Sequence, residues 1–201
     1  MPRSPKQQRS KATVDAIIKA GFICVADKGL AATTTRHIAK VAGVGVGSIY
    51  EYFEDKEAIY FAMSEVFTED LAHMITDITP RLTEETIENA LRILLENLKA
   101  FLQRDDSLYL RYGRKAASLE YKESQKIINN VLIELLMQYL LKHPELASLT
   151  NIPGISYFLM HGGSYAIMSH LLDPAPTISF DELADAIATM ADSYAKQQLA
   201  S

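Results

Sequence analysis

The chain has 201 residues, of which 48% are hydrophobic and 22% are charged. This composition is typical of one or two globular domains and excludes a disordered or low-complexity protein. The single Cys can form neither an internal disulfide nor a Cys-rich zinc site. The basic N-terminus is not followed by the apolar segment of a secretory signal, so we expect a cytoplasmic protein.

Charge is distributed unevenly within the net value of -5. Residues 1–56 carry nine Lys or Arg and five Asp or Glu, whereas residues 57–201 carry eleven and twenty. This asymmetry is either ordinary fluctuation or a basic module that meets an anion, joined to an acidic body. The first fourteen residues contain no acidic side chain, and they hold a basic arm suited to phosphates or simply to solubility: Arg3, Lys6, Arg9 and Lys11.

Three long segments show helical periodicity. Apolar residues recur at spacings of three and four over residues 14–25, and Gly29 is placed to end that helix. A second helix is expected over residues 87–102 with Thr83 as its cap, and a third begins at the capping-box spacing of Ser179-Phe-Asp-Glu182. No run of alternating polar and apolar residues predicts a strand, so we expect an all-α fold.

The segment Gly43–Ser48 contains Gly-x-Gly-x-Gly, which invites comparison with nucleotide-binding loops. A dinucleotide fingerprint requires a preceding strand, and a P-loop requires Gly-Lys-Ser/Thr. Here residues 36–42 have helical spacing, and the Gly-Lys-Ser/Thr motif is missing. A short helix, a Gly-containing turn and another short helix form the helix-turn-helix plan, although such pairs also occur in unrelated proteins.

Individual residues fit that plan. Thr34 can cap the first short helix, and Gly43 allows a positive φ at the turn. Tyr50 and Tyr52 are expected to project from the second helix, and Lys56 to begin the next one. A small apolar core is expected to hold the two helices together: Ile38, Val41, Val44, Ile49 and Phe53.

Residues 33–56 resemble the DNA-binding signature of the TetR family of bacterial transcription regulators. The resemblance rests on Thr-x-Arg-x-Ile-Ala, Ala-Gly-Val, Gly-Ser-Ile-Tyr and Tyr-Phe-x-x-Lys at fixed offsets. It implies a three-helix helix-turn-helix DNA-binding domain with a basic arm over residues 1–56. It also implies a helical bundle for ligand binding and dimerisation over residues 57–201.

The resemblance also implies roles for single residues. Thr34 and Lys56 would hold phosphates, Gly47 would let the backbone approach DNA, and Tyr50 would bond a phosphate oxygen. Arg36 would contact either a base edge or a phosphate. The DNA-binding set is Thr34, Thr35, Arg36, Gly45, Val46, Gly47, Ser48, Tyr50, Tyr52 and Lys56.

Two positions depart from the family's usual pattern. Gly45 stands where Ser or Thr is common, so it can cap the recognition helix only without a side-chain oxygen. Val46 replaces a polar residue and can offer only an apolar contact, such as one with a thymine methyl group. Specificity then depends on Arg36, the arm and DNA shape. Tyr52 can touch a phosphate or merely pack, and His37 is expected to be solvated.

Residues 146–172 contain no Asp, Glu, Lys or Arg. The stretch is long enough for a membrane span but lacks flanking Lys or Arg anchors, so we expect no membrane partner. A helix that is apolar on all sides is otherwise buried on all sides, here between its own core and a second subunit. Together with the last helix it would form a four-helix interface in a homodimer, as the resemblance also implies, with contacts at Gly162, Gly163, Ala166, Leu183, Ile187 and Ala191.

Aromatic and polar residues beyond the DNA-binding segment are candidates for an apolar ligand pocket with a few polar groups. They are Met74, Tyr109, Tyr112, Tyr157, Phe158, His161 and Tyr165, each of which can equally be a core or interface residue. The five His residues show no metal-binding spacing, and no nucleophile motif is present, so we expect no metal, cofactor or catalysis. Cys24 is expected to be a small buried hydrophobe.

We therefore expect a homodimeric repressor that binds a palindromic double-stranded DNA operator and is released by a largely apolar small-molecule effector. Activation, or the use of the ligand as a corepressor, is the alternative direction of response. A protein of another class, a helical small-molecule-binding or enzymatic protein with a vestigial DNA-binding module, is the alternative to regulation.

Overall fold

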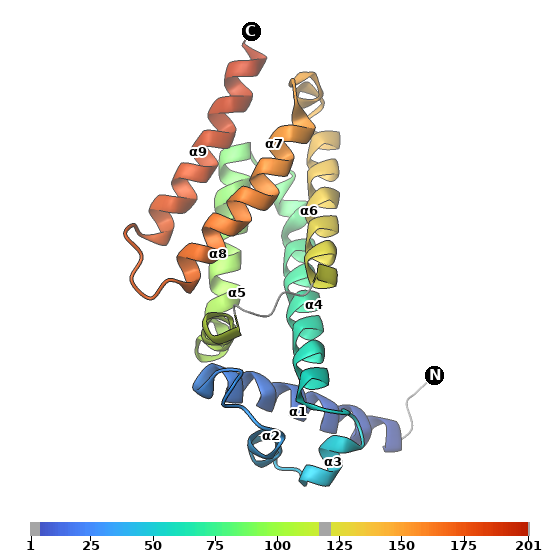
Figure 1. Ribbon diagram of the computed structural model, residues 1–201. Coiled ribbons are helices and arrows are strands. Elements are labelled where there is room, and N and C mark those ends of the chain that lie inside the picture. The colour runs from blue at the N-terminus through green and yellow to red at the C-terminus, as the bar shows by residue number, and fades with distance from the viewer. Residues whose placement is uncertain (1–4, 117–121, 201) are drawn as a thin grey trace. The chain divides into compact units, whose positions relative to one another are not determined.

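The computed structural model describes residues 5–116 and 122–200, and these residues are all-helical, as predicted (Figure 1). The elements in chain order are α1 (Pro5–Lys28), α2 (Thr35–Ala42), α3 (Val46–Tyr50), α4 (Lys56–Leu82), α5 (Ile87–Ala116), α6 (Lys122–Lys142), the 3-10 turn η1 (Pro144–Ser148), α7 (Ile152–Phe158), the π-helical turn η2 (Leu159–Gly163), α8 (Ser164–Leu172) and α9 (Phe180–Leu199).

The chain divides into two compact units, and α4 and α5 contribute to both. The first unit consists of Met1–Glu69 and Leu102–Tyr121, and the second of Asp70–Phe101 and Lys122–Ser201. The expected domain boundary after residue 56 falls at the first residue of α4, and the early turns of that helix belong to the first unit.

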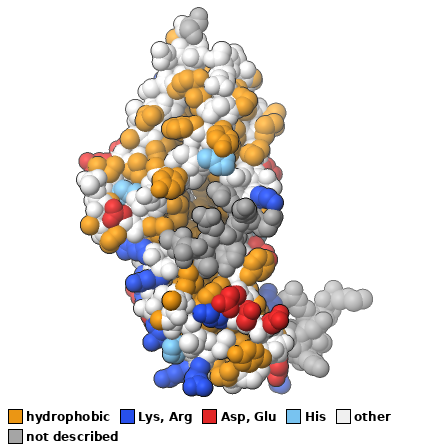
Figure 2. All heavy atoms as spheres, in the orientation of Figure 1, with side chains coloured by type: hydrophobic (Ala, Val, Ile, Leu, Met, Phe, Trp, Pro, Cys, Tyr) orange, Lys and Arg blue, Asp and Glu red, His pale blue; other side chains and the backbone are white. Residues whose placement is uncertain are grey.

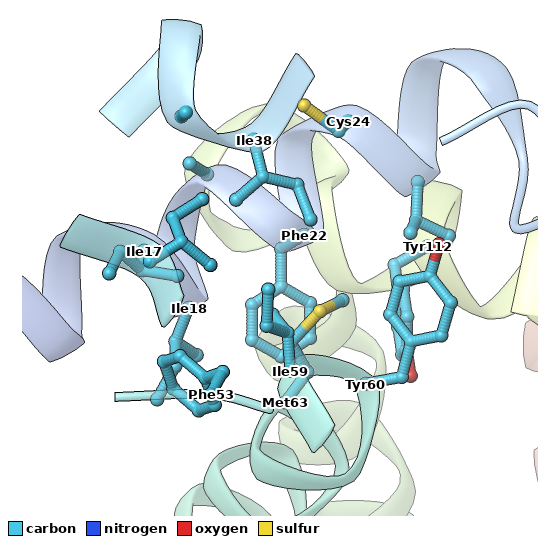
Figure 3. Packing of buried hydrophobic residues seen from close by; sticks show 14 of the residues in the cluster. Ile17, Ile18, Phe22, Cys24, Ile38, Phe53, Ile59, Tyr60, Met63 and Tyr112 are labelled. Carbon is cyan, nitrogen blue, oxygen red and sulfur yellow. The ribbon is translucent and has the colours of Figure 1, made fainter. Parts of the chain in front are cut away.

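The first unit has a core built on the apolar face of α1 (Figure 3). The predicted face is buried, with Ile17 and Val25 fully enclosed, and Gly29 ends the helix at a φ of 79°. Phe22 meets the rings of Tyr109 and Tyr112 edge to face, with centroids 5.1 and 4.9 Å apart. Burial raises the pKa of the Cys24 thiol, which is enclosed as expected of a small hydrophobe.

The second unit is a bundle in which α8 and α9 lie side by side (Figure 1). The helical segment that includes α8 runs from Ile152 to Leu172 without interruption, although its central turn is π-helical. The capping box of α9 is present as predicted, with the Ser179 side chain accepting from the backbone of Glu182 at 3.1 Å. The Glu182 carboxylate accepts in return from the Ser179 N–H at 2.7 Å.

This capping box makes stability depend on pH. The hydrogen bonds from Ser179 hold the pKa of Glu182 below its ordinary value in the folded state. The contribution of Glu182 is therefore complete above the pKa of the unfolded chain, and it is lost as pH falls through the folded value. We expect the melting temperature of Glu182→Gln to fall less between pH 6 and pH 3 than that of the wild type, as measured by circular dichroism. Parallel pH profiles would contradict the prediction.

Two local predictions, the cap at Thr83 and the burial of Val41, were wrong. Thr83 does not cap α5, because it lies in the turn that ends α4 and donates to the carbonyl of Pro80; Thr86 caps α5 by accepting from the N–H of Asn89. Val41 is 47% exposed and lies outside the core of the helix pair. Pro80 lies within the last turn of α4.

A break interrupts α5. The Leu periodicity alone does not predict this break. Arg104 is extended, and the following residues adopt left-handed backbone angles, with φ of 51° at Asp105, 57° at Asp106 and 55° at Ser107. Such angles are uncommon outside glycine and cost roughly 1–2 kcal/mol per residue. Asp106 helps to hold the break by accepting from Arg111 at 3.3 Å. The part of α5 after the break packs on α1 through Tyr109 and Tyr112.

Candidate DNA-contacting surface and interior cavity

The first candidate site is the helix pair α2 and α3. Thr34 caps α2 as predicted, accepting from the N–H of His37 at 3.2 Å. Gly43 ends α2 in the left-handed region with a φ of 70°, which a side chain would disfavour. Ile38 and Ile49 are fully buried and hold the two helices together. These are the local features of a helix-turn-helix.

The expected DNA-binding residues lie on α2, on α3, in the turns that flank them and at the start of α4, and none of them is buried. Most are exposed, and three are half-buried: Thr35, Ser48 and Lys56. Tyr50 is exposed at the end of α3, with its hydroxyl 3.4 Å from that of Thr35. Tyr52 is also exposed but lies in the turn after α3 rather than on it. Lys and Arg side chains gather near α2 (Figure 2).

The glycines of α3 leave its backbone accessible. Gly45 caps the helix without a side-chain hydrogen bond, as predicted. No atom from elsewhere lies within 4 Å of the position that a Cβ would take on Gly47. No packing contact within the described chain therefore requires a glycine at residue 47. Val46 is 37% exposed and presents an apolar side chain beside it.

The remaining expectations for this region have mixed outcomes. His37 is half-buried rather than solvated, and its Nδ1 is enclosed with no hydrogen-bond partner among the described residues. Arg9 and Lys11 of the basic arm are exposed. Arg3 and the side chain of Lys6 lie outside the described residues.

The cap of α2 leads to a separable prediction. Thr34→Ala removes the capping oxygen and should lower the free energy of unfolding by about 1 kcal/mol. Thr34→Asn restores a capping oxygen, so its stability should match that of the wild type within about 0.5 kcal/mol. If the Thr34 hydroxyl also bonds a phosphate, Thr34→Ala loses DNA affinity, whereas the amide of Thr34→Asn can supply a donor in its place. Urea unfolding with DNA titration checks this, and a DNA affinity for Thr34→Ala equal to that of the wild type would exclude the phosphate role.

The second candidate site is a cavity of about 350 Å³ inside the second unit. Its walls come from α4, α5, α6, η1, α7, η2, α8 and α9, and they consist mainly of Leu, Ile, Met and Ala. Burial raises the pKa of the lining phenol Tyr139 to about 12, and its hydroxyl donates to the carbonyl of Glu85 at 2.8 Å. The volume lies in the range of small-molecule sites.

The seven pocket candidates do not come together. Met74 lines the cavity. Tyr109 and Tyr112 belong to the core of the first unit. The others are placed along α7, η2 and α8, where His161 is half-buried against the Tyr157 ring and the remaining three are exposed: Tyr157, Phe158 and Tyr165.

The interface candidates are also divided. Gly162 is exposed, and Ala166 and Leu183 are half-buried. The other three line the cavity: Gly163, Ile187 and Ala191. The described surface of α7 and α8 instead presents the three aromatic residues that were expected in the pocket, and Figure 2 shows hydrophobic side chains across this face.

The sequence alone does not mark most of the cavity lining as a site. The helix expected over residues 87–102 contributes four leucines at helical spacing to the lining: Leu91, Leu94, Leu95 and Leu98. Periodicity identifies a buried face but does not distinguish a packed core from the wall of a cavity.

The described residues form neither a metal site nor a membrane-spanning helix. Within residues 5–116 and 122–200, no cluster of His, Cys, Asp and Glu has the arrangement of a metal site. In the same part of the chain, no helix combines the length and hydropathy needed to cross a bilayer.

Comparison with known proteins identifies the helix-turn-helix. Residues 17–63 match the model of the bacterial regulatory proteins of the tetR family. This range contains most of α1, all of α2 and α3, and the beginning of α4. No curated protein matches the chain.

Solved structures share the fold over nearly the full chain. A TetR-family transcription regulator from Marinobacter aquaeolei is 23% identical, with a TM-score of 0.65 over 94% of this chain and 97% of that one. FadR from Bacillus subtilis, solved with stearoyl-CoA, is 20% identical, with a TM-score of 0.65 over 89% and 97%. SmeT, repressor of the Stenotrophomonas maltophilia multidrug efflux pump SmeDEF, is 19% identical, with a TM-score of 0.65 over 90% and 91%.

The family match and the helix-turn-helix geometry agree on the N-terminal module. Regulators of this family are non-enzymatic, which removes the alternative of an enzyme with a vestigial DNA-binding module. The chain is a DNA-binding transcriptional regulator whose residues 17–63 carry the module of the bacterial regulatory proteins of the tetR family.

Proposed function

We propose that this regulator is a homodimeric repressor that leaves its operator when a largely apolar small molecule occupies the cavity of the second unit. The observation that carries the proposal is that one chain holds both an accessible helix-turn-helix and an apolar cavity of about 350 Å³. The first part supplies binding to DNA, and the second supplies a place for an effector.

On DNA, α3 enters the major groove and the surrounding residues hold the phosphates. Tyr50 and Lys56 contact phosphates, as does Thr34 at the start of α2. The backbone at Gly47 approaches the DNA, which agrees with the open space at its missing Cβ. Arg36 is exposed on α2 and reads a base edge, supported by an apolar contact from Val46. The same surface includes Thr35, Gly45, Ser48 and Tyr52.

Dimerisation uses the apolar surface of α7, α8 and α9. Tyr157, Phe158 and Tyr165 are 60–77% exposed, and Met190 on α9 is 64% exposed. Large side chains exposed this way mark an interaction surface. Gly162, Ala166 and Leu183 belong to the same proposed interface. A two-fold dimer then presents two recognition helices to half-sites about 34 Å apart.

The effector acts through α4. This helix begins at Lys56 beside the DNA-contacting surface, and its later residues Met74, Ile75 and Leu82 line the cavity. A ligand that displaces these later turns therefore acts on the helix that leaves the DNA-binding module. A coupling of about 1–3 kcal/mol would weaken operator binding roughly 5- to 150-fold. The structural likeness to FadR and SmeT supports a repressor with a small-molecule site.

Selection from a pool of random DNA duplexes tests the proposal. The full chain should enrich a palindrome, and light scattering should report about twice the 22.4 kDa mass of the chain. Apolar compounds that raise the melting temperature should then release the selected duplex. A monomer, an asymmetric site, or ligands that only strengthen DNA binding would contradict the dimer, the palindrome or the repressor direction, respectively.

A further inference from the structure

Gly163 occupies an unusual position in the cavity wall. It is buried at the end of the π-helical turn and lines the cavity. No side chain and no other part of the chain beyond its own helical turn lies within 4 Å of the position that a Cβ would take. A buried residue whose missing side chain would meet nothing faces open internal space. Its neighbour Gly162 differs, because a Cβ there would lie 3.3 Å from the Phe158 ring.

The π-helical turn explains how a glycine comes to face inward. A π turn holds one residue more than an α turn, which rotates the following residues by about 100° relative to a regular helix. The turn spans Leu159–Gly163, and the cavity is lined on both sides of it, by Met160 before Gly163 and by Ile167 after it. The absence of a side chain at residue 163 therefore enlarges the cavity, because any larger residue there would project into it.

The described lining of the cavity carries no charged side chain. Its members are aliphatic residues, Met, Gly and a few hydroxyl-bearing residues. The hydroxyls are largely engaged within the protein: Tyr194 donates to the carbonyl of Thr150 at 3.1 Å, and Thr150 donates to Gln198 at 2.6 Å. An ionised group of a ligand would find no counter-charge among these residues, and burying it there would be strongly unfavourable.

The size of the cavity limits the ligand as well. An apolar cavity of about 150 Å³ accommodates benzene, so by proportion about 350 Å³ corresponds to roughly 14 non-hydrogen atoms. This is a molecule of two fused or linked rings, or a medium-length hydrocarbon chain.

We propose that the cavity accepts an uncharged, apolar molecule of this size and that Gly163 is the residue that sets the size limit. The proposal rests on the proposed effector function and names the chemical class of that effector. By this proposal, the cavity does not bind ligands that bury a carboxylate or phosphate group in it. Side chains larger than hydrogen at residue 163 occupy the space that the ligand needs.

Two fluorescent probes with the same aromatic framework test the charge requirement. Methyl naphthalene-2-carboxylate is uncharged and has the two fused rings of the proposed ligand, and naphthalene-2-carboxylate is an anion of nearly the same size at neutral pH. Titrated into the full chain at neutral pH, the uncharged probe should bind at least about tenfold more tightly than the anionic one, because the site offers no partner for the carboxylate. Equal affinities, with each probe displacing the other, would overturn the requirement for an uncharged ligand.

Two leucine substitutions test the role of Gly163. Gly163→Leu should weaken binding of the uncharged probe about tenfold or more. In the absence of the probe, this variant should melt at or above the wild-type temperature, because the new side chain fills open space. Ser169→Leu is the matched control, since it places the same side chain at an exposed position further along the same helical segment that does not line the cavity. If Gly163→Leu unfolds early, Gly163→Ala should retain the fold and weaken the probe to a smaller degree.

The outcomes separate this inference from the proposed function. Unchanged probe affinity in folded Gly163→Leu or Gly163→Ala would overturn the assignment of Gly163, and failure of both probes to bind the wild type would overturn the inference as a whole. Binding that depends on residue 163 supports it. If that binding leaves DNA affinity unchanged, the inference stands and release from the operator by such a ligand fails.

Discussion

Gly21→Val should unfold the first unit under conditions in which the wild type is folded. Gly21 lies on α1 where it faces α4, and a Cβ there would lie 2.5 Å from Sδ of Met63 and 3.3 Å from Cγ2 of Ile59. Both of those side chains are fully buried, so they cannot move aside without displacing the core (Figure 3). We expect Val to cost about 3 kcal/mol of unfolding free energy, at the upper end for overpacking. Ala should cost less, because it gains up to about 1 kcal/mol of helix propensity over Gly.

Urea unfolding followed by circular dichroism measures this effect. Gly47→Ala is the control, because its Cβ points into open space and its stability should match or exceed that of the wild type. In the double variant Gly21→Ala/Met63→Ala, the clash is absent, so its loss of stability should be smaller than the sum of the single losses. A Gly21→Val protein within about 0.5 kcal/mol of the wild type would show that α1 and α4 are not so closely packed.

Arg36→Ala and Tyr50→Ala should weaken DNA binding in different ways. Arg36 is proposed to read a base edge, so its loss should reduce affinity for the selected duplex by about 5- to 150-fold while changing random DNA little. Tyr50 is proposed to bond a phosphate, so its loss should reduce both affinities by the same factor. Because Gly45 and Val46 bring no hydrogen-bonding side chain to the recognition helix, discrimination rests heavily on Arg36.

Fluorescence anisotropy with the selected and a scrambled duplex distinguishes the two roles. Tyr50→Phe is the matched control, since it keeps the ring and removes only the hydroxyl that lies 3.4 Å from Thr35. Its losses should follow those of Tyr50→Ala if the hydroxyl makes the phosphate contact. Equal losses on both duplexes for Arg36→Ala would assign Arg36 to the phosphates instead.

The DNA-binding module could be predicted in detail because its signals are local. The cap at Thr34, the left-handed glycine at residue 43 and the buried Ile38 and Ile49 each follow from their immediate neighbours in sequence. The errors here were small. Val41 is apolar without being buried, and Tyr52 falls just past a recognition helix that ends at Tyr50.

For the second unit, only the helices could be predicted. The sequence of a helix that is apolar on all sides does not show which face packs against the core. Tyr157, His161 and Tyr165 share one helical face and were expected to line the pocket, yet Tyr157 and Tyr165 point to the surface. Gly163, expected at the dimer interface, lines the cavity instead. Both faces of residues 152–172 are apolar, so the sequence pattern does not indicate which face is buried. The π-helical turn also rotates the residues that follow it relative to a regular α-helix.

Neither the break in α5 nor the cap of the same helix could be predicted, because both depend on contacts or boundaries outside the local sequence. Asp105, Asp106 and Ser107 are compatible with a helix, and their left-handed angles depend on tertiary packing rather than on a glycine or proline signal. Thr83 and Thr86 are equally good caps in sequence, and only the end of α4 at Leu82 decides between them.

The salt dependence of DNA affinity tests the central claim most directly. Lys and Arg side chains that neutralise phosphates release counterions, so the affinity falls steeply with salt. With about six phosphates neutralised per dimer, we predict a loss of roughly 10³-fold in wild-type affinity for the selected duplex between 50 and 200 mM salt. Tyr50→Ala should bind more weakly throughout with a similar slope, because it removes a hydrogen bond and no charge. An affinity that barely changes with salt, with Tyr50→Ala indistinguishable from the wild type, would contradict DNA binding through α2 and α3.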